Sequence, residues 1–190
     1  MKNFTIILTT IFLLFSAPSV ASESQMLLNE GRGLVKIFFT GLKGKLVTAL
    51  KSGGAVKAIK VCSMEAVEVA SDIADNSGWE IKRTSLKLRN PGNEPDAWER
   101  DVLHKFNARK AAGENPEKME FSAIVVEDGE RIFRYMKAIP TANKPCLVCH
   151  GTAIKAPVAK VLDEIYPSDQ ARGYKAGDIR GAFSFRKTIN

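Results

Sequence analysis

The sequence predicts an α+β fold, in which long helices come first and mostly antiparallel strands with interposed helices follow. Three observations lead to this class. Residues 23–74 carry apolar side chains at helical spacing, residues 121–139 form two strand-like runs around an Asp-Gly turn, and Gly and Pro clusters separate the segments. The chain has 190 residues, of which 45% are hydrophobic and 26% charged, so it fits one ordinary domain with its own core.

Two helices are expected in the first half of the chain. Residues 23–50 place Leu and Phe roughly every 3.6 residues, although four glycines weaken this helix intrinsically. The Ser-Gly-Gly sequence at 52–54 interrupts the pattern, and residues 55–74 then form a sharper apolar stripe. The stripe consists of Ala55, Ile59, Cys62, Ala66, Val69 and Ile73. The Asn-Ser-Gly sequence at 76–78 is typical of a helix C-terminus.

The pattern then changes to short strands and loops. Residues 79–88 partly alternate and are expected to form a strand, whereas residues 89–95 contain two Pro and two Asn and are expected to form a loop. Asp96, followed three residues later by Glu99, is the Asp version of a capping box and predicts a helix that reaches about Ala112.

The second half of the chain is expected to start with a β-hairpin. Residues 121–126 and 131–139 are strand candidates, and Glu-Asp-Gly-Glu at 127–130 is a hairpin signal. A short helix after Cys146, a helix over residues 158–166, a Gly-rich loop and a last strand over residues 181–187 complete the prediction.

The first 21 residues have the layout of a secretory signal peptide. Lys2 supplies the positive charge, residues 4–15 are uncharged and mostly apolar, and small residues occupy positions 19 and 21. The alternative is a membrane anchor, but a span needs about 20 apolar residues and Pro18 interrupts the stretch. We therefore expect cleavage after Ala21, a single domain over residues 22–190, export to a bacterial periplasm and no membrane span in the mature chain.

The positive charge of the chain is a weak functional signal. The 28 Lys and Arg residues exceed the 21 Asp and Glu residues, which gives +7, and removal of Lys2 with the signal peptide leaves +6. The basic residues are scattered among acidic ones with no run of five, so we expect no nucleic-acid partner. The charge would suit an acidic protein partner.

The strongest motif is Cys-Leu-Val-Cys-His at residues 146–150. Thiols at Cys146 and Cys149 can each add to one vinyl group of a haem, and His150 is then the proximal iron ligand. Three alternatives are a zinc half-site, for which only Cys62 and His104 remain as partners, a thioredoxin-like redox pair, and a structural disulfide. The motif favours one covalently bound haem c.

A second axial iron ligand has to come from the remaining side chains. The candidates are His104, Cys62, Met26, Met64, Met119 and Met136. Helical geometry places His104 opposite the apolar side of its helix, so that it faces solvent, and Met64 on the outer face of the helix over residues 55–74. Cys62 lies in the middle of the apolar stripe, where spacing alone fits either a core thiol or a ligand. Met119 and Met136 stay open, and Met26 lies near the new terminus.

A Cys62 ligand would have a functional consequence. An anionic thiolate stabilises ferric over ferrous iron and so implies a low reduction potential. Reduction weakens the iron–thiolate bond, so Cys62 could leave the iron when the protein is reduced or when a small gas such as CO or NO arrives. A ligand that leaves in this way can act as a switch.

Several longer motifs resemble a known family over nearly all of the mature chain. The family is that of small exported single-haem c-type proteins with a PAS-like fold, and the same module occurs as the sensor part of membrane histidine kinases. The matching segments are Ala58–Cys62, Arg83–Ser85, Arg89–Glu99, Lys144–Gly151, Tyr166–Pro167 and Gly173–Ser184. The resemblance implies a PAS-like antiparallel sheet and His/Cys axial ligation, with the Cys on the helix that precedes the sheet. Cys62 occupies that place in this sequence.

The remaining expectations concern the haem surroundings and the role of the protein. Arg83 and Arg89 could contact haem propionates or be solvated, and Asp96 is expected to be a helix cap rather than a proton carrier. The expected function is a redox or small-ligand sensor that informs a separate, unidentified partner protein. The alternative is a periplasmic electron carrier. A haem enzyme ranks last, because Cys62 would fill the position that a substrate needs, so we expect no enzymatic activity.

Overall fold

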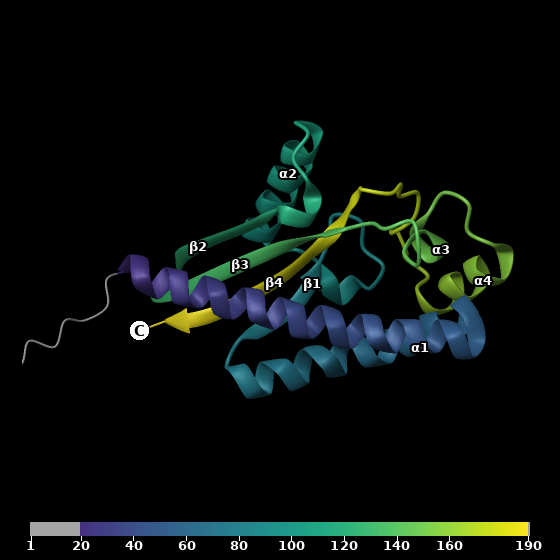
Figure 1. The fold of residues 1–190 in the computed structure, drawn as a ribbon, viewed down its shortest axis with the longest axis horizontal. Helices are drawn as coiled ribbons and strands as arrows, with labels where there is room; N and C mark the ends of the chain where they lie inside the picture. The colour runs from purple at the N-terminus through teal and green to yellow at the C-terminus, as the bar shows by residue number, and fades with distance from the viewer. Residues whose placement is uncertain (1–19, 190) are drawn as a thin grey trace, which may run out of the picture.

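The computed structural model describes residues 20–189 and confirms the α+β class (Figure 1). A four-stranded antiparallel sheet has the order β1 (Glu80–Thr84), β4 (Ile179–Ile189), β3 (Glu130–Pro140) and β2 (Glu120–Glu127). The helix α1 (Val20–Ser77) covers one face of this sheet, and α2 (Ala97–Ala111) covers the other. Residues 1–19 of the predicted signal peptide lie outside the described part. Within residues 20–189, no helix combines the length and the apolar character that crossing a membrane requires.

The helix α1 is a hairpin of two arms. Gly53 and Gly54 leave helical geometry, and Gly54 has a φ of 67°, in the left-handed region that favours glycine. The chain therefore reverses here, and the first arm (20–52) and second arm (55–77) lie side by side (Figure 1). Lys45 of the first arm pairs with Glu65 of the second. The predicted break between two helices is confirmed.

The strands β2 and β3 form a hairpin. Asp128 and Gly129, between β2 and β3, have φ values of 51° and 84°. Two central residues with positive φ are what a tight type I′ hairpin turn requires, so the Asp-Gly prediction is confirmed.

Two strands differ from their predicted bounds by two residues or more. The first strand ends at Thr84 rather than at residue 88, because the Ser85 hydroxyl donates to the Arg180 carbonyl at 2.7 Å and lies 3.0 Å from the Lys87 carbonyl, which turns the chain away from the sheet. The last strand extends over 179–189, beyond the predicted 181–187, because its pairing with β3 covers nearly its whole length. The predicted loop at 89–95 contains the 3-10 turn η1 (Pro91–Asn93).

The remaining helices are short. η2 (Pro116–Lys118) precedes β2, while α3 (Leu147–His150) and α4 (Ala156–Ile165) lie between β3 and β4. Both α3 and α4 occur where the sequence predicts helices.

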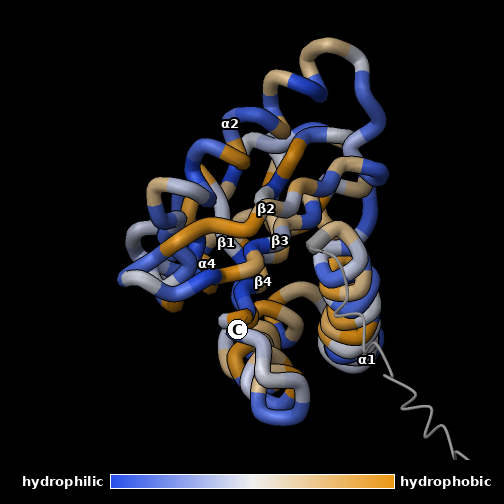
Figure 2. The backbone as a smooth tube through the Cα atoms, turned by 90° about the vertical axis from the view of Figure 1, so that its left-hand side faces the viewer, coloured by the Kyte–Doolittle hydropathy of each residue, from blue (hydrophilic) through white to orange (hydrophobic). Residues whose placement is uncertain are grey.

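The strand pleat divides the core between the two faces of the sheet. On β3, Phe133 and Tyr135 pack toward α1, whereas Met136 and Ala138 pack toward α2. In Figure 2, α1 alternates between hydrophobic and hydrophilic colour along its length, as expected for a helix with one face against a core.

Gly181 of β4 permits close contact with β1, and this predicts a stability effect. A Cβ atom at this position would lie 2.2 Å from the Thr84 carbonyl oxygen. We expect Gly181→Ala to lower the free energy of unfolding by about 1–3 kcal/mol, measured by denaturant titration. Gly33→Ala is the matched control, since a Cβ there meets nothing within 4 Å and should add about 1 kcal/mol of helix stability. Equal stability of the two variants would contradict this interpretation.

The predicted capping box at the start of α2 is confirmed. The Glu99 N–H donates to Asp96 Oδ1 at 2.8 Å, and the Asp96 N–H donates to Glu99 Oε2 at 2.9 Å. The other Asp96 oxygen, Oδ2, lies 2.5 Å from Nη2 of the buried Arg134, whose guanidinium stacks 4.4 Å from the centre of the Trp98 ring. Asp96 therefore caps the helix and also anchors it to β3.

Two substitutions of Asp96 should separate these roles. Burial alone would raise the pKa of Asp96, but Arg134 and the Glu99 N–H outweigh it and hold this pKa below the ordinary value of 3.8. The charge therefore contributes stability above the unfolded pKa, and this contribution is lost as the pH falls through the lower folded pKa. Asp96→Asn keeps the cap but loses the charge. Near pH 7 we therefore expect it to lower the free energy of unfolding by less than about 1 kcal/mol, and this difference should disappear under acid conditions. Asp96→Ala also removes the cap and should cost about 1 kcal/mol more at every pH.

Urea titrations of the three proteins at several pH values measure these differences. If the stability loss of Asp96→Asn does not change with pH, the ion pair between Asp96 and Arg134 is contradicted.

Candidate functional site

The Cys-x-x-Cys-His motif forms a single helical turn at one end of the sheet. α3 lies beside α4 and near the end of α1 where its two arms meet (Figure 1). The Cys146 carbonyl accepts from the Cys149 N–H at 3.2 Å and from the His150 N–H at 2.9 Å. Cys146 and Cys149 are both free thiols that are partly accessible, and Val148 between them is 38% exposed. The motif therefore lies at the protein surface with both sulfur atoms unpaired.

The His150 ring has one nitrogen fixed by the backbone. Nδ1 lies 2.7 Å from the Ala171 carbonyl oxygen and 3.2 Å from Arg180 Nε. Because a carbonyl only accepts, the shorter contact assigns the proton to Nδ1 and leaves the lone pair on Nε2. Burial, and then the charges of Arg180 and Arg89, lower the pKa of His150 to about 3, so the ring is neutral at ordinary pH. Nε2 lies 3.5 Å from Arg89 Nη1. A neutral imidazole with its lone pair on Nε2 is the form that binds a metal.

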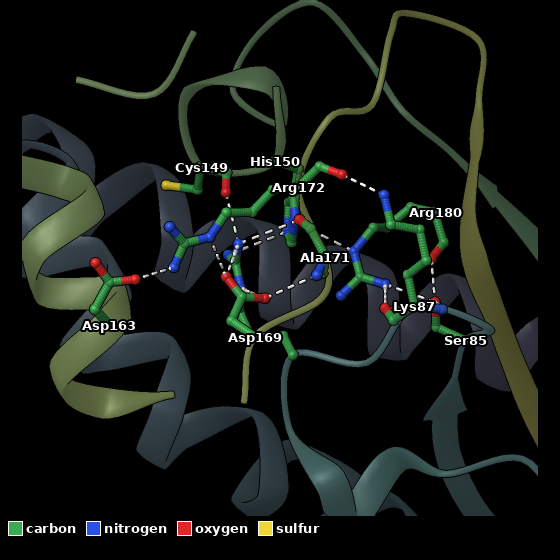
Figure 3. Close-up of polar contacts among 10 residues, drawn as sticks. Ser85, Lys87, Cys149, His150, Asp163, Asp169, Ala171, Arg172 and Arg180 are labelled. Carbon is green, nitrogen blue, oxygen red and sulfur yellow. Dashed lines mark hydrogen bonds and ion pairs between the residues drawn. The ribbon is translucent and has the colours of Figure 1, made fainter. Parts of the chain in front are cut away.

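A buried carboxylate organises the surroundings of this ring (Figure 3). Asp169, whose side chain is 1% exposed, pairs with Arg89 through both oxygens at 3.1 Å and accepts from Arg172 Nε at 2.8 Å and from the Ala171 N–H at 2.9 Å. Arg89 Nη2 also donates to the Cys149 carbonyl at 2.6 Å. The motif is thus attached to the loop before β4 through charged side chains.

Arg180 is a site residue that no sequence pattern predicted. Its Nη1 donates to the Ser85 hydroxyl at 2.8 Å and to the Lys87 carbonyl at 3.2 Å, and its Nε faces His150. Burial lowers the pKa of Arg180 from its ordinary value. The one available signal was its position inside a matched family segment.

Cys62 lies on the second arm of α1, on the side that meets the motif. One turn earlier, Ile59 packs with Val158 and Leu162 of α4, and Cys149 packs against the same cluster. Burial raises the pKa of the Cys62 thiol, and the charge of Arg83 opposes this. Burial also raises the pKa of Cys149. The charge of Arg89 opposes this rise, and the Cys62 sulfur adds to it. The two thiols are therefore within electrostatic reach of each other.

The Arg83 guanidinium has an unusual environment. It extends from β1 into a partly buried position, and burial lowers its pKa, while Cys62 and Tyr166 act in the opposite direction. Among residues 20–189 it makes no hydrogen bond and no ion pair, in contrast to Arg89 and Arg180. A partly buried cation without a protein partner among these residues suits an anionic ligand.

The other candidate ligands lie elsewhere. His104 on α2 is exposed, and Met26 and Met64 are 58% and 62% exposed, which confirms the predicted outward faces of His104 and Met64. Met119 and Met136, which the sequence left open, are fully buried in the core between α2 and the sheet. Over residues 20–189, no three His, Cys, Asp or Glu side chains come together as a metal-ion site.

Comparisons with known proteins agree with these features. The sequence model of the Tll0287-like family matches residues 16–187. The crystal structure of the cyanobacterial heme-protein Tll0287 is similar to this structure, with a TM-score of 0.61 and 25% sequence identity. The similarity covers 90% of this chain and 96% of that chain. A search of curated proteins gives no match.

Proposed function

Because the chain belongs to the Tll0287-like family, we propose that it is a haem-binding, cytochrome-like protein. The observation that carries this proposal is the geometry of His150. Its Nδ1–H is directed at the Ala171 carbonyl at 2.7 Å, which leaves Nε2 as an electron-pair donor next to two free thiols on the same helical turn. This donor set fits a c-type haem.

The proposed cofactor is one covalently bound haem c. Cys146 and Cys149 would form the two thioether bonds, and His150 would be the proximal iron ligand. When bound, haem supplies an iron centre that alternates between ferric and ferrous states and can take a diatomic gas. Maturation of such a cofactor after export agrees with the predicted signal peptide and a periplasmic location.

Cys62 is the proposed distal iron ligand. It comes from the arm of α1 that packs on the same cluster as Cys149, and it is within electrostatic reach of that residue. The placement of His104, Met119 and Met136 away from α3 supports this choice. The charge of Arg83 near Cys62 would stabilise an anionic sulfur.

The arginines of the site are suited to two haem propionates. The charges of Arg83 and Arg89 both act on Arg180, and so does the buried carboxylate of Asp169. Arg83 lacks a protein partner among the described residues and is the best placed to bind a propionate. A propionate contact of Arg89 stays a prediction, because this side chain already binds Asp169 and the Cys149 carbonyl.

The biological role that these features favour is a redox or small-ligand sensor. Loss of the Cys62 bond on reduction or gas binding would free the second arm of α1, which packs on both the sheet and α4, so a change at the iron could reach the surface. The second candidate is a periplasmic electron carrier, and the surface position of α3 favours it, because an exposed haem edge is what electron exchange needs.

Exposure of the reduced protein to CO or NO separates the two roles. A sensor should show displacement of its sixth ligand in visible spectra at micromolar gas. A spectrum unchanged by either gas, combined with fast reversible electron exchange, would exclude the sensor and leave the carrier.

A further inference from the structure

We infer that Asp169 is a positioning residue for His150, because it holds the Ala171 carbonyl in place to accept the hydrogen bond from His150 Nδ1. The inference rests on the proposed ligation of iron by His150. It concerns how firmly that ligand is oriented and how strongly it donates.

The first step is the attachment of Ala171 to Asp169. The Ala171 N–H donates to Asp169 Oδ1 at 2.9 Å, while the Ala171 carbonyl accepts from His150 at 2.7 Å. The two polar groups of one fully buried residue therefore join the carboxylate to the imidazole (Figure 3). Movement of the Asp169 carboxylate would move the acceptor that orients the ring.

The second step is the rigidity of the carboxylate itself. Its two oxygens receive Arg89 bidentately, Arg172 at 2.8 Å and the Ala171 N–H. A side chain that is 1% exposed and accepts from several donors has little freedom to move. Arg172 is held in turn by Asp163 at 2.5 Å.

The third step is the attachment of the same loop to the haem-binding turn. Arg89 joins Asp169 to the Cys149 carbonyl, the Tyr174 N–H donates to the His150 carbonyl at 2.9 Å, and the Gly173 N–H donates to the Gly151 carbonyl at 3.0 Å. The turn and the acceptor for its imidazole thus move as one unit.

The expected consequence is electronic. A firm hydrogen bond from Nδ1 makes an imidazole a stronger donor, and a stronger donor favours ferric iron. Loss of the Asp169 carboxylate should weaken that bond and favour ferrous iron. Changes in the surroundings of a metal-binding His typically alter its affinity by about 10–100-fold. We expect a shift of the ferric–ferrous ratio of about tenfold, or ~59 mV for one electron.

The test uses the full-length, haem-loaded protein and three variants. Asp169→Asn and Asp169→Glu are compared with Asp163→Asn. The Asp163 carboxylate is 66% exposed and pairs with Arg172, as Asp169 does, but it makes no hydrogen bond to Ala171. The readouts are the reduction potential and the ¹H NMR signal of the His150 Nδ1 proton. Both Asp169 variants should shift the potential upward and shift the Nδ1 signal, and Asp163→Asn should match the wild type.

The outcomes separate the inference from the proposed function. If Asp169→Glu matches the wild type while Asp169→Asn does not, only charge matters and the positioning role is overturned. If the Asp169 variants do not fold, slow exchange of the Nδ1 proton in wild-type D₂O solution supports the role, whereas fast exchange overturns it. A wild-type visible spectrum that His150→Ala leaves unchanged would refute the ligation itself, and the inference with it.

Discussion

Replacing Cys146 and Cys149 together with Ser is expected to leave the chain without covalently bound haem. A thioether forms from a thiol, and these two free thiols lie on the turn that carries His150. The measurement is mass spectrometry of the denatured protein, in which a covalently bound haem stays with the chain. Each single variant should retain one thioether bond and therefore a weaker attachment of the haem. The double variant should lose essentially all covalently bound haem.

The third cysteine is the matched control for this experiment. Cys62→Ser removes a thiol of similar exposure, and under our proposal it should leave covalent attachment intact. Retention of covalent haem in the Cys146/Cys149 double variant, or its loss in Cys62→Ser, would contradict the assignment of the thioether bonds.

Cys62→Ala is expected to change the iron coordination while leaving the haem attached. Loss of an anionic thiolate should abolish a low-spin thiolate signal in the ferric EPR spectrum. It should also raise the reduction potential by on the order of 0.1 V, since axial ligand identity spans about 0.8 V among haem proteins. The reduced variant should bind CO without displacing a protein ligand.

Met64→Ala is the control for Cys62→Ala. Met64 lies on the same arm of α1 two residues away, but its side chain is 62% exposed on the outer surface. Its removal should change neither the spectra nor the potential. Identical EPR spectra for Cys62→Ala and the wild type would refute the Cys62 ligand and require another residue at the sixth position.

Much of the fold could be predicted from the sequence because its signals are local. The Gly-Gly break at 53–54, the Asp96/Glu99 capping box and the Asp-Gly turn at 128–129 each depend on a few neighbouring residues whose backbone preferences are strong. The Cys-x-x-Cys-His motif is local in the same sense, since one helical turn brings its three side chains together. The end of β1 was predicted less well, because the turn at Ser85 depends on a carbonyl 95 residues away.

The surroundings of the motif required the tertiary structure. A backbone carbonyl leaves no mark in a sequence, so the role of Ala171 as the acceptor for His150 could not be predicted. Asp169 and Arg180 are ordinary charged residues until the loop before β4 folds against α3 and buries them. Met119 and Met136 remained open candidates, because only the pairing register of β3 decides which face of the sheet Met136 occupies.

The sequence by itself therefore determined the elements, the paired thiols of the motif and the candidate ligands, since short-range backbone and side-chain chemistry specifies them. The tertiary structure decided which candidates lie near His150, which arginine lacks a protein partner within residues 20–189, and which carbonyl orients the ring. These properties arise from long-range packing and burial, which bring together residues as distant as Cys62 and Cys149 and give their charges a common environment.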